Sequence, residues 1–346
     1  MDFRMNKLLK KMMVALLSLG LAQAVWADNM PNFQKTLQAA KQGNVDAQYN
    51  LGVMYAIGQG VPQDDAQAVQ WYRQAAEQGD AQAQSNLGLM YYKGEGVRQD
   101  YAEAFRWYRK AAEQGLVQAQ YNLGDMYNQG RGVRQDYAEA FRWYRKAAEQ
   151  GLVQAQTDLG NGYTQGQGVR QDYAQAVQWY RKAAEQGYAG AQVNLGLMYE
   201  QGQGVRQDYA QAVQWYRRAA EQGNADAQVN LGLMYANGQG VRQDDAQAVQ
   251  WYRQAAEQGD AQAQVLLGLM YANGQGVRQD YTQAVQWCRR AAEQGHAGAQ
   301  FNLGVMYAEG RGVRQDLALA QEWFGKACQN GDQDGCDIYQ RLKAGY

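Results

Sequence analysis

"AQYNLGVMYAIGQGVPQDDAQAVQWYRQAAEQG", residues 47–79, is followed by close copies of itself along most of the 346-residue chain. When the copies are aligned on the glycine of "LG", each step is 36 residues. The aligned glycines are Gly52, Gly88, Gly124, Gly160, Gly196, Gly232, Gly268 and Gly304. A constant period of this length predicts a solenoid of stacked repeats. The predicted repeats 1 to 8 span residues 44–79, 80–115, 116–151, 152–187, 188–223, 224–259, 260–295 and 296–331.

The sequence pattern within each repeat predicts two antiparallel helices. In residues 80–115, Asp80 is placed to cap the first helix and Gly94 to end it, because glycine tolerates positive φ. Asp100 then starts the second helix, and Glu103, three residues later, predicts a capping box. The pattern contains no strand signal, so the chain is predicted to be an all-α solenoid of antiparallel helix pairs.

Gly88 lies inside the predicted first helix, where glycine costs about 1 kcal/mol relative to alanine. Because this glycine recurs in every repeat, it predicts a helix contact too close for a side chain. Met and Trp also recur at fixed positions. Stripes of this kind predict core packing rather than a metal or cofactor site.

The first 27 residues, "MDFRMNKLLKKMMVALLSLGLAQAVWA", read as a secretory signal peptide. A basic head precedes an apolar run from Met12 to Leu21, and the small residues Val25 and Ala27 are placed for cleavage. A membrane anchor is the alternative, but the run is shorter than the ~20 residues that span a bilayer. The mature chain is therefore predicted to be exported without stable membrane insertion. We expect a periplasmic location, with secretion or surface display as alternatives.

The charges exclude one class of partner. The formal net charge is -1, and no block of basic residues exists. Nucleic-acid binding needs clustered Lys and Arg, so nucleic acid is not an expected partner. The oligomeric state cannot be read from these features.

"NLG", "GxGV", a capping Asp, "WY" and "AAEQG" together resemble a Sel1-like repeat, a relative of the tetratricopeptide repeat. The resemblance implies a right-handed superhelix of antiparallel helix pairs, with the first helices lining a concave surface. It also implies an adaptor that binds proteins. Residues 28–43 resemble a lone second helix and residues 332–346 a lone first helix, as expected for the two capping helices.

No catalytic, cofactor-binding or metal-binding set is predicted, so the protein is expected not to be an enzyme. The single histidine, His296, has no partner with which to build a metal site or a nucleophile relay. "GQGV" lacks the Lys and Ser/Thr of a phosphate-binding loop. Two alternatives remain: a β-lactamase-like or penicillin-binding activity, as described for some cysteine-rich relatives, and a secreted or surface host-interaction factor. No Ser-x-x-Lys supports the first.

Cys328 and Cys336 have the C-x7-C spacing that resembles cysteine-rich exported Sel1-like proteins, where such pairs join neighbouring helices. The resemblance implies a disulfide between them. Cys288 replaces the Tyr of "WY" and is expected to be a free, partly buried thiol.

Recognition is expected where the repeats differ, along a stripe of first-helix positions i, i+4 and i+7. In repeats 3 and 4 polar residues interrupt a stripe that is mostly apolar, and they predict an acidic patch suited to a basic or amide-rich ligand. By resemblance, a recurring asparagine beside the stripe would hold a peptide backbone. The predicted groove residues are Asn50, Asn86, Asn122, Tyr121, Asp125, Asn128, Thr157, Asp158, Asn161, Thr164, Asn194, Asn230 and Asn302.

Neutral drift is the alternative explanation of the patch. Residues 97–120 are identical to residues 133–156, which indicates growth by duplication, and redundant copies can decay. Gly162 fits either reading, because it replaces the recurring Met and is expected to cost about 2–5 kcal/mol. The sequence thus predicts a non-catalytic scaffold that binds a protein or peptide in its concave groove.

Overall fold

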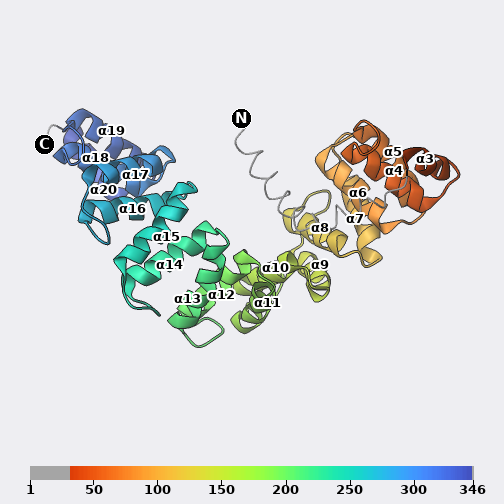
Figure 1. Ribbon diagram of the computed structural model, residues 1–346, viewed down its shortest axis with the longest axis horizontal. Helices are drawn as coiled ribbons and strands as arrows, with labels where there is room; N and C mark the ends of the chain where they lie inside the picture. The colour runs from red at the N-terminus through yellow and green to blue at the C-terminus, as the bar shows by residue number, and fades with distance from the viewer. Residues whose placement is uncertain (1–31, 345–346) are drawn as a thin grey trace. The chain divides into compact units, whose positions relative to one another are not determined.

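The computed structural model describes residues 32–344, and the predicted signal peptide lies outside them. The chain divides into two compact units, an N-terminal unit that ends at Ala147 and a C-terminal unit that begins at Ala148. Within the described residues every regular element is a helix (Figure 1). The prediction of an all-α solenoid is therefore confirmed.

The N-terminal unit contains α3 Phe33–Lys41, α4 Val45–Ile57, α5 Asp65–Glu77, α6 Ala81–Lys93, α7 Tyr101–Glu113, α8 Val117–Gln129 and most of α9 Tyr137–Glu149. The C-terminal unit contains α10 Val153–Gln165, α11 Tyr173–Glu185, α12 Ala189–Gln201, α13 Tyr209–Glu221, α14 Ala225–Asn237, α15 Asp245–Glu257, α16 Ala261–Asn273, α17 Tyr281–Glu293, α18 Ala297–Glu309, α19 Leu317–Gln329 and α20 Gln333–Lys343. Within each unit helices that follow one another pack together.

The core lies between successive repeats rather than inside one of them. In one cluster, Tyr72 of α5 packs with Leu87 and Met90 of α6 and with Trp107 of α7. These side chains come from three helices of two successive repeats. A single repeat therefore cannot bury its own apolar face, as expected for a solenoid. The recurring Met and Trp are packing residues, as predicted.

The recurring glycine of "LG" makes the close contact that the sequence predicts. A Cβ atom on Gly88 would lie 2.9 Å from Cδ1 of Tyr108, the Tyr of "WY" in the same repeat. The same contact recurs along the chain, with Cys288 facing Gly268 in repeat 7 and Phe324 facing Gly304 in repeat 8. The glycine thus lets an aromatic ring lie flat against the first helix.

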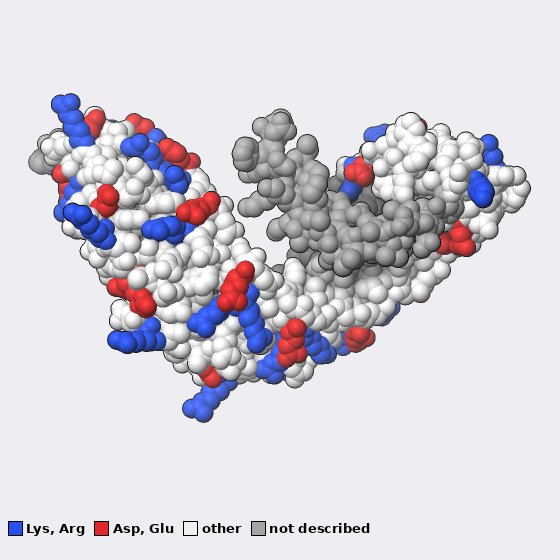
Figure 2. Space-filling model, viewed as in Figure 1, with Lys and Arg blue, Asp and Glu red and all other residues white. Residues whose placement is uncertain are grey.

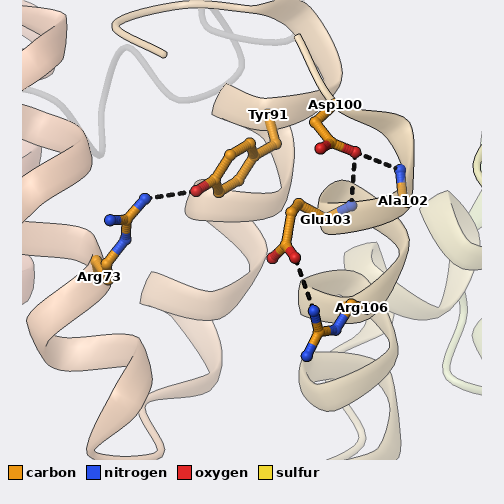
Figure 3. Close-up of polar contacts among 6 residues, drawn as sticks. All are labelled: Arg73, Tyr91, Asp100, Ala102, Glu103 and Arg106. Carbon is orange, nitrogen blue, oxygen red and sulfur yellow. Dashed lines mark hydrogen bonds and ion pairs between the residues drawn. The ribbon is translucent and has the colours of Figure 1, made fainter. Parts of the chain in front are cut away.

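The capping box predicted at α7 forms only in part (Figure 3). The Asp100 carboxylate accepts from the N–H groups of Ala102 and Glu103 at 2.9 and 3.0 Å. The Asp100 N–H, however, donates to the Tyr91 carbonyl at 2.9 Å. The Glu103 carboxylate, left without that donor, accepts from Arg106 at 2.7 Å. The preceding loop, folded back onto the first helix, satisfies the group that the box would have used.

A buried glutamine that the sequence reading overlooked connects each repeat to the one before it. Gln84 is 4% exposed, and its Nε2 donates to the Ala76 carbonyl at 3.0 Å. Its Oε1 accepts from Gln114 Nε2 at 2.8 Å. Buried glutamines occupy the same position in every repeat, at Gln48, Gln84, Gln120, Gln156, Gln192, Gln228, Gln264 and Gln300.

The C-terminal end is closed by a disulfide. Cys328 at the end of α19 is bonded to Cys336 in α20, so the predicted pair is present. Cys288 is a free thiol that is fully buried, and burial raises its pKa to about 12. Among the helices between residues 32 and 344, none has both the length and the hydropathy to cross a membrane.

Candidate functional site

The polar stripe residues lie beside a row of tyrosine hydroxyls. The Tyr of "WY" crosses the "LG" glycine, and its hydroxyl emerges next to the first-helix stripe. In repeat 4 Tyr180 Oη donates to Asn161 Oδ1 at 2.8 Å, and in repeat 5 Tyr216 Oη donates to Glu200 Oε2 at 2.5 Å. Polar residues on the stripe therefore satisfy hydroxyls that belong to the same repeat.

Three predicted groove residues meet in the C-terminal unit. Asn161 Nδ2 donates to Asp158 Oδ1 at 3.3 Å, and Asn194 Nδ2 of the next repeat donates to Asn161 Oδ1 at 3.3 Å. With Tyr180, which the sequence prediction did not include, they form what we call the Asp158 cluster: Asp158, Asn161, Asn194 and Tyr180. All but the tyrosine are half-buried.

The electrostatics of the Asp158 cluster are set by burial and by its one carboxylate. Burial raises the pKa of Tyr180 to about 12, and the charge of Asp158 acts in the same direction. Burial and then the same charge raise the pKa of Tyr188, which precedes α12 and is 36% exposed. Tyr188 therefore places an aromatic ring at the exposed edge of the cluster. A carboxylate flanked by amides and aromatic rings is suited to a cationic or amide-bearing group.

The remaining groove residues of the C-terminal unit are arranged differently. Thr157 is 8% exposed and donates to the Val153 carbonyl at 2.8 Å, while Thr164 donates to the Asn161 carbonyl at 2.9 Å. Both hydroxyls are used within their own helix. Asn230 and Asn302 are half-buried at the position that Asn194 has in repeat 5.

The polar residues of repeat 3 belong to the N-terminal unit. Tyr144 Oη donates to Asp125 Oδ1 at 2.6 Å, and the rings of Tyr144 and Tyr121 are 5.5 Å apart. Asn128 is half-buried on the next turn. The predicted patch thus falls on both units, and a joint site that includes Asp125 and Asp158 stays a prediction.

The other predicted asparagines of the N-terminal unit are half-buried. Asn86 lies beside the Tyr72 hydroxyl and Asn122 beside that of Tyr108, where each lowers the pKa that burial raises. Asn50 holds the same position in repeat 1. Asn86 and Asn122 are therefore the polar neighbours of the preceding repeat's tyrosine.

Other surface features repeat with the fold and single out no site. Shallow hollows recur beside Tyr235, Tyr271 and Tyr307, each floored by the "VRQD" segment that follows. On the face drawn in Figure 2, acidic and basic side chains are interspersed, so neither sign forms a continuous field. In the part of the chain that the structure describes, no three His, Cys, Asp or Glu residues gather as a metal site would require.

Comparison with known proteins agrees with the repeat pattern. The Sel1 repeat model matches residues 45–80, 81–116, 117–152, 153–188, 189–224, 225–260, 261–296 and 297–332. The crystal structure of a Sel1 repeat protein from Oxalobacter formigenes is similar with a TM-score of 0.74 and 37% identity over 89% of each chain. A protective antigen of uropathogenic Escherichia coli, which displays an SLR fold, is similar with a TM-score of 0.53 and 38% identity, over 90% of this chain and 82% of its own. No curated protein matches the chain. The eight matched repeats and these structures show that the chain belongs to the Sel1 repeat family.

Proposed function

We propose that this protein is an exported, non-catalytic scaffold that binds a segment of another protein in a groove lined by its first helices. The supporting observation is the Asp158 cluster. Residues that hold the fold, such as the buried glutamines and the "LG" glycines, are nearly constant from repeat to repeat. The stripe beside them varies, and at repeats 4 and 5 it carries a carboxylate and two amides linked by hydrogen bonds.

The chemistry of this cluster favours a basic or amide-rich segment. The charge of Asp158 favours a Lys or Arg side chain, and the ring of Tyr188 offers such a cation an aromatic face. The amides of Asn161 and Asn194 each have both a donor and an acceptor, which suits a peptide backbone. An ion pair between Asp158 and such a cation is stronger at a half-buried position than at a fully exposed one, because water screens it less.

A comparison of two oxidised mature proteins tests this function. One is the wild type, and the other carries Asp158→Asn, Asn161→Leu and Gly162→Met, which restore the residues of the other repeats. We expect the restored protein to be more stable and to lose a partner that the wild type retains in a pull-down. The matched control is Glu185→Gln, on the exposed row of the second helices. If the restored protein keeps every partner, recognition at the Asp158 cluster is refuted and drift explains these residues.

The non-catalytic part of the proposal has its own test. Wild-type protein incubated with nitrocefin is expected to show no turnover above background. Hydrolysis that is abolished by a change on the first-helix stripe would overturn this part and restore the β-lactamase-like alternative.

A further inference from the structure

Repeats 2 and 3 of the N-terminal unit meet at an arginine that two tyrosine rings hold in place. Arg131, in the loop after α8, donates from its guanidinium group to the Tyr92 hydroxyl. Its guanidinium carbon is 5.5 Å from the centre of the Tyr92 ring and 5.6 Å from the centre of the Tyr101 ring. The two rings are 5.2 Å apart at an angle of 67°. We call these three residues the Arg131 corner.

Two residues of the Arg131 corner depart from the repeat pattern. Tyr92 has the third position of the first-helix stripe, where other repeats carry alanine at Ala56, Ala236, Ala272 and Ala308. Arg131 has a loop position where other repeats carry glutamine at Gln59, Gln167, Gln203, Gln239 and Gln275. These two departures fall in neighbouring repeats, and the side chains bond to one another. Unrelated changes have no reason to meet in this way, so the contact argues against drift here.

The charge of Arg131 is not neutralised by any carboxylate between residues 32 and 344. Arg311 shows the alternative at the same loop position in repeat 8. It lies 5.8 Å from the centre of the Tyr281 ring, but it pairs with Glu309 at 2.7 Å. Repeat 3 carries Gln129 where repeat 8 carries Glu309. The carboxylate that completes the arrangement in repeat 8 is therefore replaced by a neutral amide in repeat 3.

An arginine held in this way is suited to bind a carboxylate. Arg131 is exposed, whereas both tyrosines are half-buried, so the cation lies at the surface. One N–H group is used on Tyr92, and the remaining N–H groups can bind the two oxygens of a carboxylate. An exposed ion pair is usually weak, because two long side chains must be ordered to form it. Here the rings and the hydroxyl have already ordered the arginine, which lowers that cost.

We propose that the Arg131 corner binds the carboxylate of an aspartate or glutamate side chain in a segment of a partner protein. The segment lies along the first-helix stripe, where Leu89, one turn before Tyr92, is 36% exposed and offers an apolar contact. This inference rests on the proposed function, since it requires the stripe to bind protein segments. It adds an acidic residue to the basic or amide-bearing groups that the Asp158 cluster favours.

A single carboxylate fits the Arg131 corner better than a polyanion does. Lys93 pairs with Glu95 at 3.5 Å. Arg106 and Arg109 pair with glutamates of their own helix, α7. These cations are already neutralised and do not add to the charge of Arg131. A polyanion needs several free cations, whereas one ordered guanidinium group is sufficient for one carboxylate.

The test selects random short peptides on the oxidised mature wild type. The peptides are displayed at the N-terminal end of a phage coat protein, so they offer acidic side chains but no free C-terminus. Two variants restore residues of other repeats and are therefore expected to fold: Arg131→Gln and Tyr92→Ala. Arg134→Gln is the matched control, because it removes a charge from the same loop but outside the corner.

Selected peptides are then synthesised with amidated C-termini in two forms, one with the acidic residue and one with the corresponding amide. Their dissociation constants are measured by fluorescence anisotropy. We expect an acidic residue to recur among the selected peptides, and the acidic form to bind the wild type about fivefold more tightly than the amide form. Arg131→Gln should abolish this difference and Tyr92→Ala should reduce it, whereas a merely structural loss would weaken both forms alike. Arg134→Gln should retain it.

Three results would overturn this inference and leave the binding of protein segments standing. The first is a set of selected peptides without a recurring acidic residue. The second is an Arg131→Gln or Tyr92→Ala protein that distinguishes the two forms as well as the wild type does. The third is an equal loss in Arg134→Gln, because the effect would then be one of net charge. If no peptide is enriched on the wild type, the proposed function is itself refuted, and this inference with it.

Discussion

Replacing Gly196 by alanine is expected to destabilise the protein, although alanine is the better helix former. An added Cβ would lie 2.6 Å from Cε1 of Tyr216, whereas non-bonded carbons prefer about 3.5–4.0 Å. The ring must therefore move by about 1 Å. It has little room to do so, because Tyr216 is 0% exposed and its hydroxyl is bonded to Glu200 at 2.5 Å. Overpacking of this kind costs about 1–3 kcal/mol, and the upper end applies here.

The higher helix propensity of alanine offsets about 1 kcal/mol of that cost. The net expectation is a loss of about 1–2 kcal/mol in the free energy of unfolding, measured by urea denaturation followed by circular dichroism. Gly298→Ala is the matched control within the same chain. Its added Cβ would meet nothing closer than 3.5 Å, so it should gain up to about 1 kcal/mol. If Gly196→Ala is as stable as the wild type or more so, close packing is not the reason for the recurring glycine.

Three further changes have expected outcomes. Gln228→Leu removes a buried amide that donates to the Ala220 carbonyl, and it should lower the free energy of unfolding in urea by about 1–2 kcal/mol. Gln258→Ala, which removes the exposed partner of Gln228, should cost less than half of that. Equal costs would contradict the role given to the buried hydrogen bond. Because burial raises the folded-state pKa of Tyr180 to about 12, its contribution is fully present below the unfolded pKa of about 10 and is lost as the pH rises through 12. The urea midpoint should therefore fall between these pH values, and less steeply in Tyr180→Phe; identical slopes would refute this. Cys328→Ser with Cys336→Ser should cost roughly 2–3 kcal/mol, and hydrogen exchange should show the loss first in α20; unchanged exchange there would refute it.

The architecture could be predicted because each signal is local and occurs many times. Gly88 and its equivalents predict the close contact correctly, since a glycine inside eight helices needs a reason. The predicted capping box forms only in part, because the prediction placed Glu103 from a spacing of three residues alone. The geometry at the start of α7 depends on the Tyr91 carbonyl of α6, because the loop between the two helices brings the Asp100 N–H to it.

The candidate site was harder to predict, for a physical reason. Asp125 and Asn161 stand out because they differ between repeats, but their partners Tyr144 and Tyr180 do not differ from their neighbours and gave no signal. The buried glutamines were missed because a glutamine on a helix usually indicates a solvated face. A constant spacing of 30 residues between Gln84 and Gln114 was the available signal. Drift and recognition at Asp158 are separated only by the binding experiment.

The disulfide that joins α19 to α20 makes the two ends of the solenoid differ in how easily they open. In an array held together by contacts between neighbours, opening begins at an end, where a helix has one neighbour instead of two. Cys328 and Cys336 hinder that first step at the C-terminal end, whereas the described contacts of α3 are packing and hydrogen bonds. A protease would then meet an opened N-terminal repeat before an opened C-terminal one. The repeats nearest the disulfide are therefore the last to be exposed to cleavage.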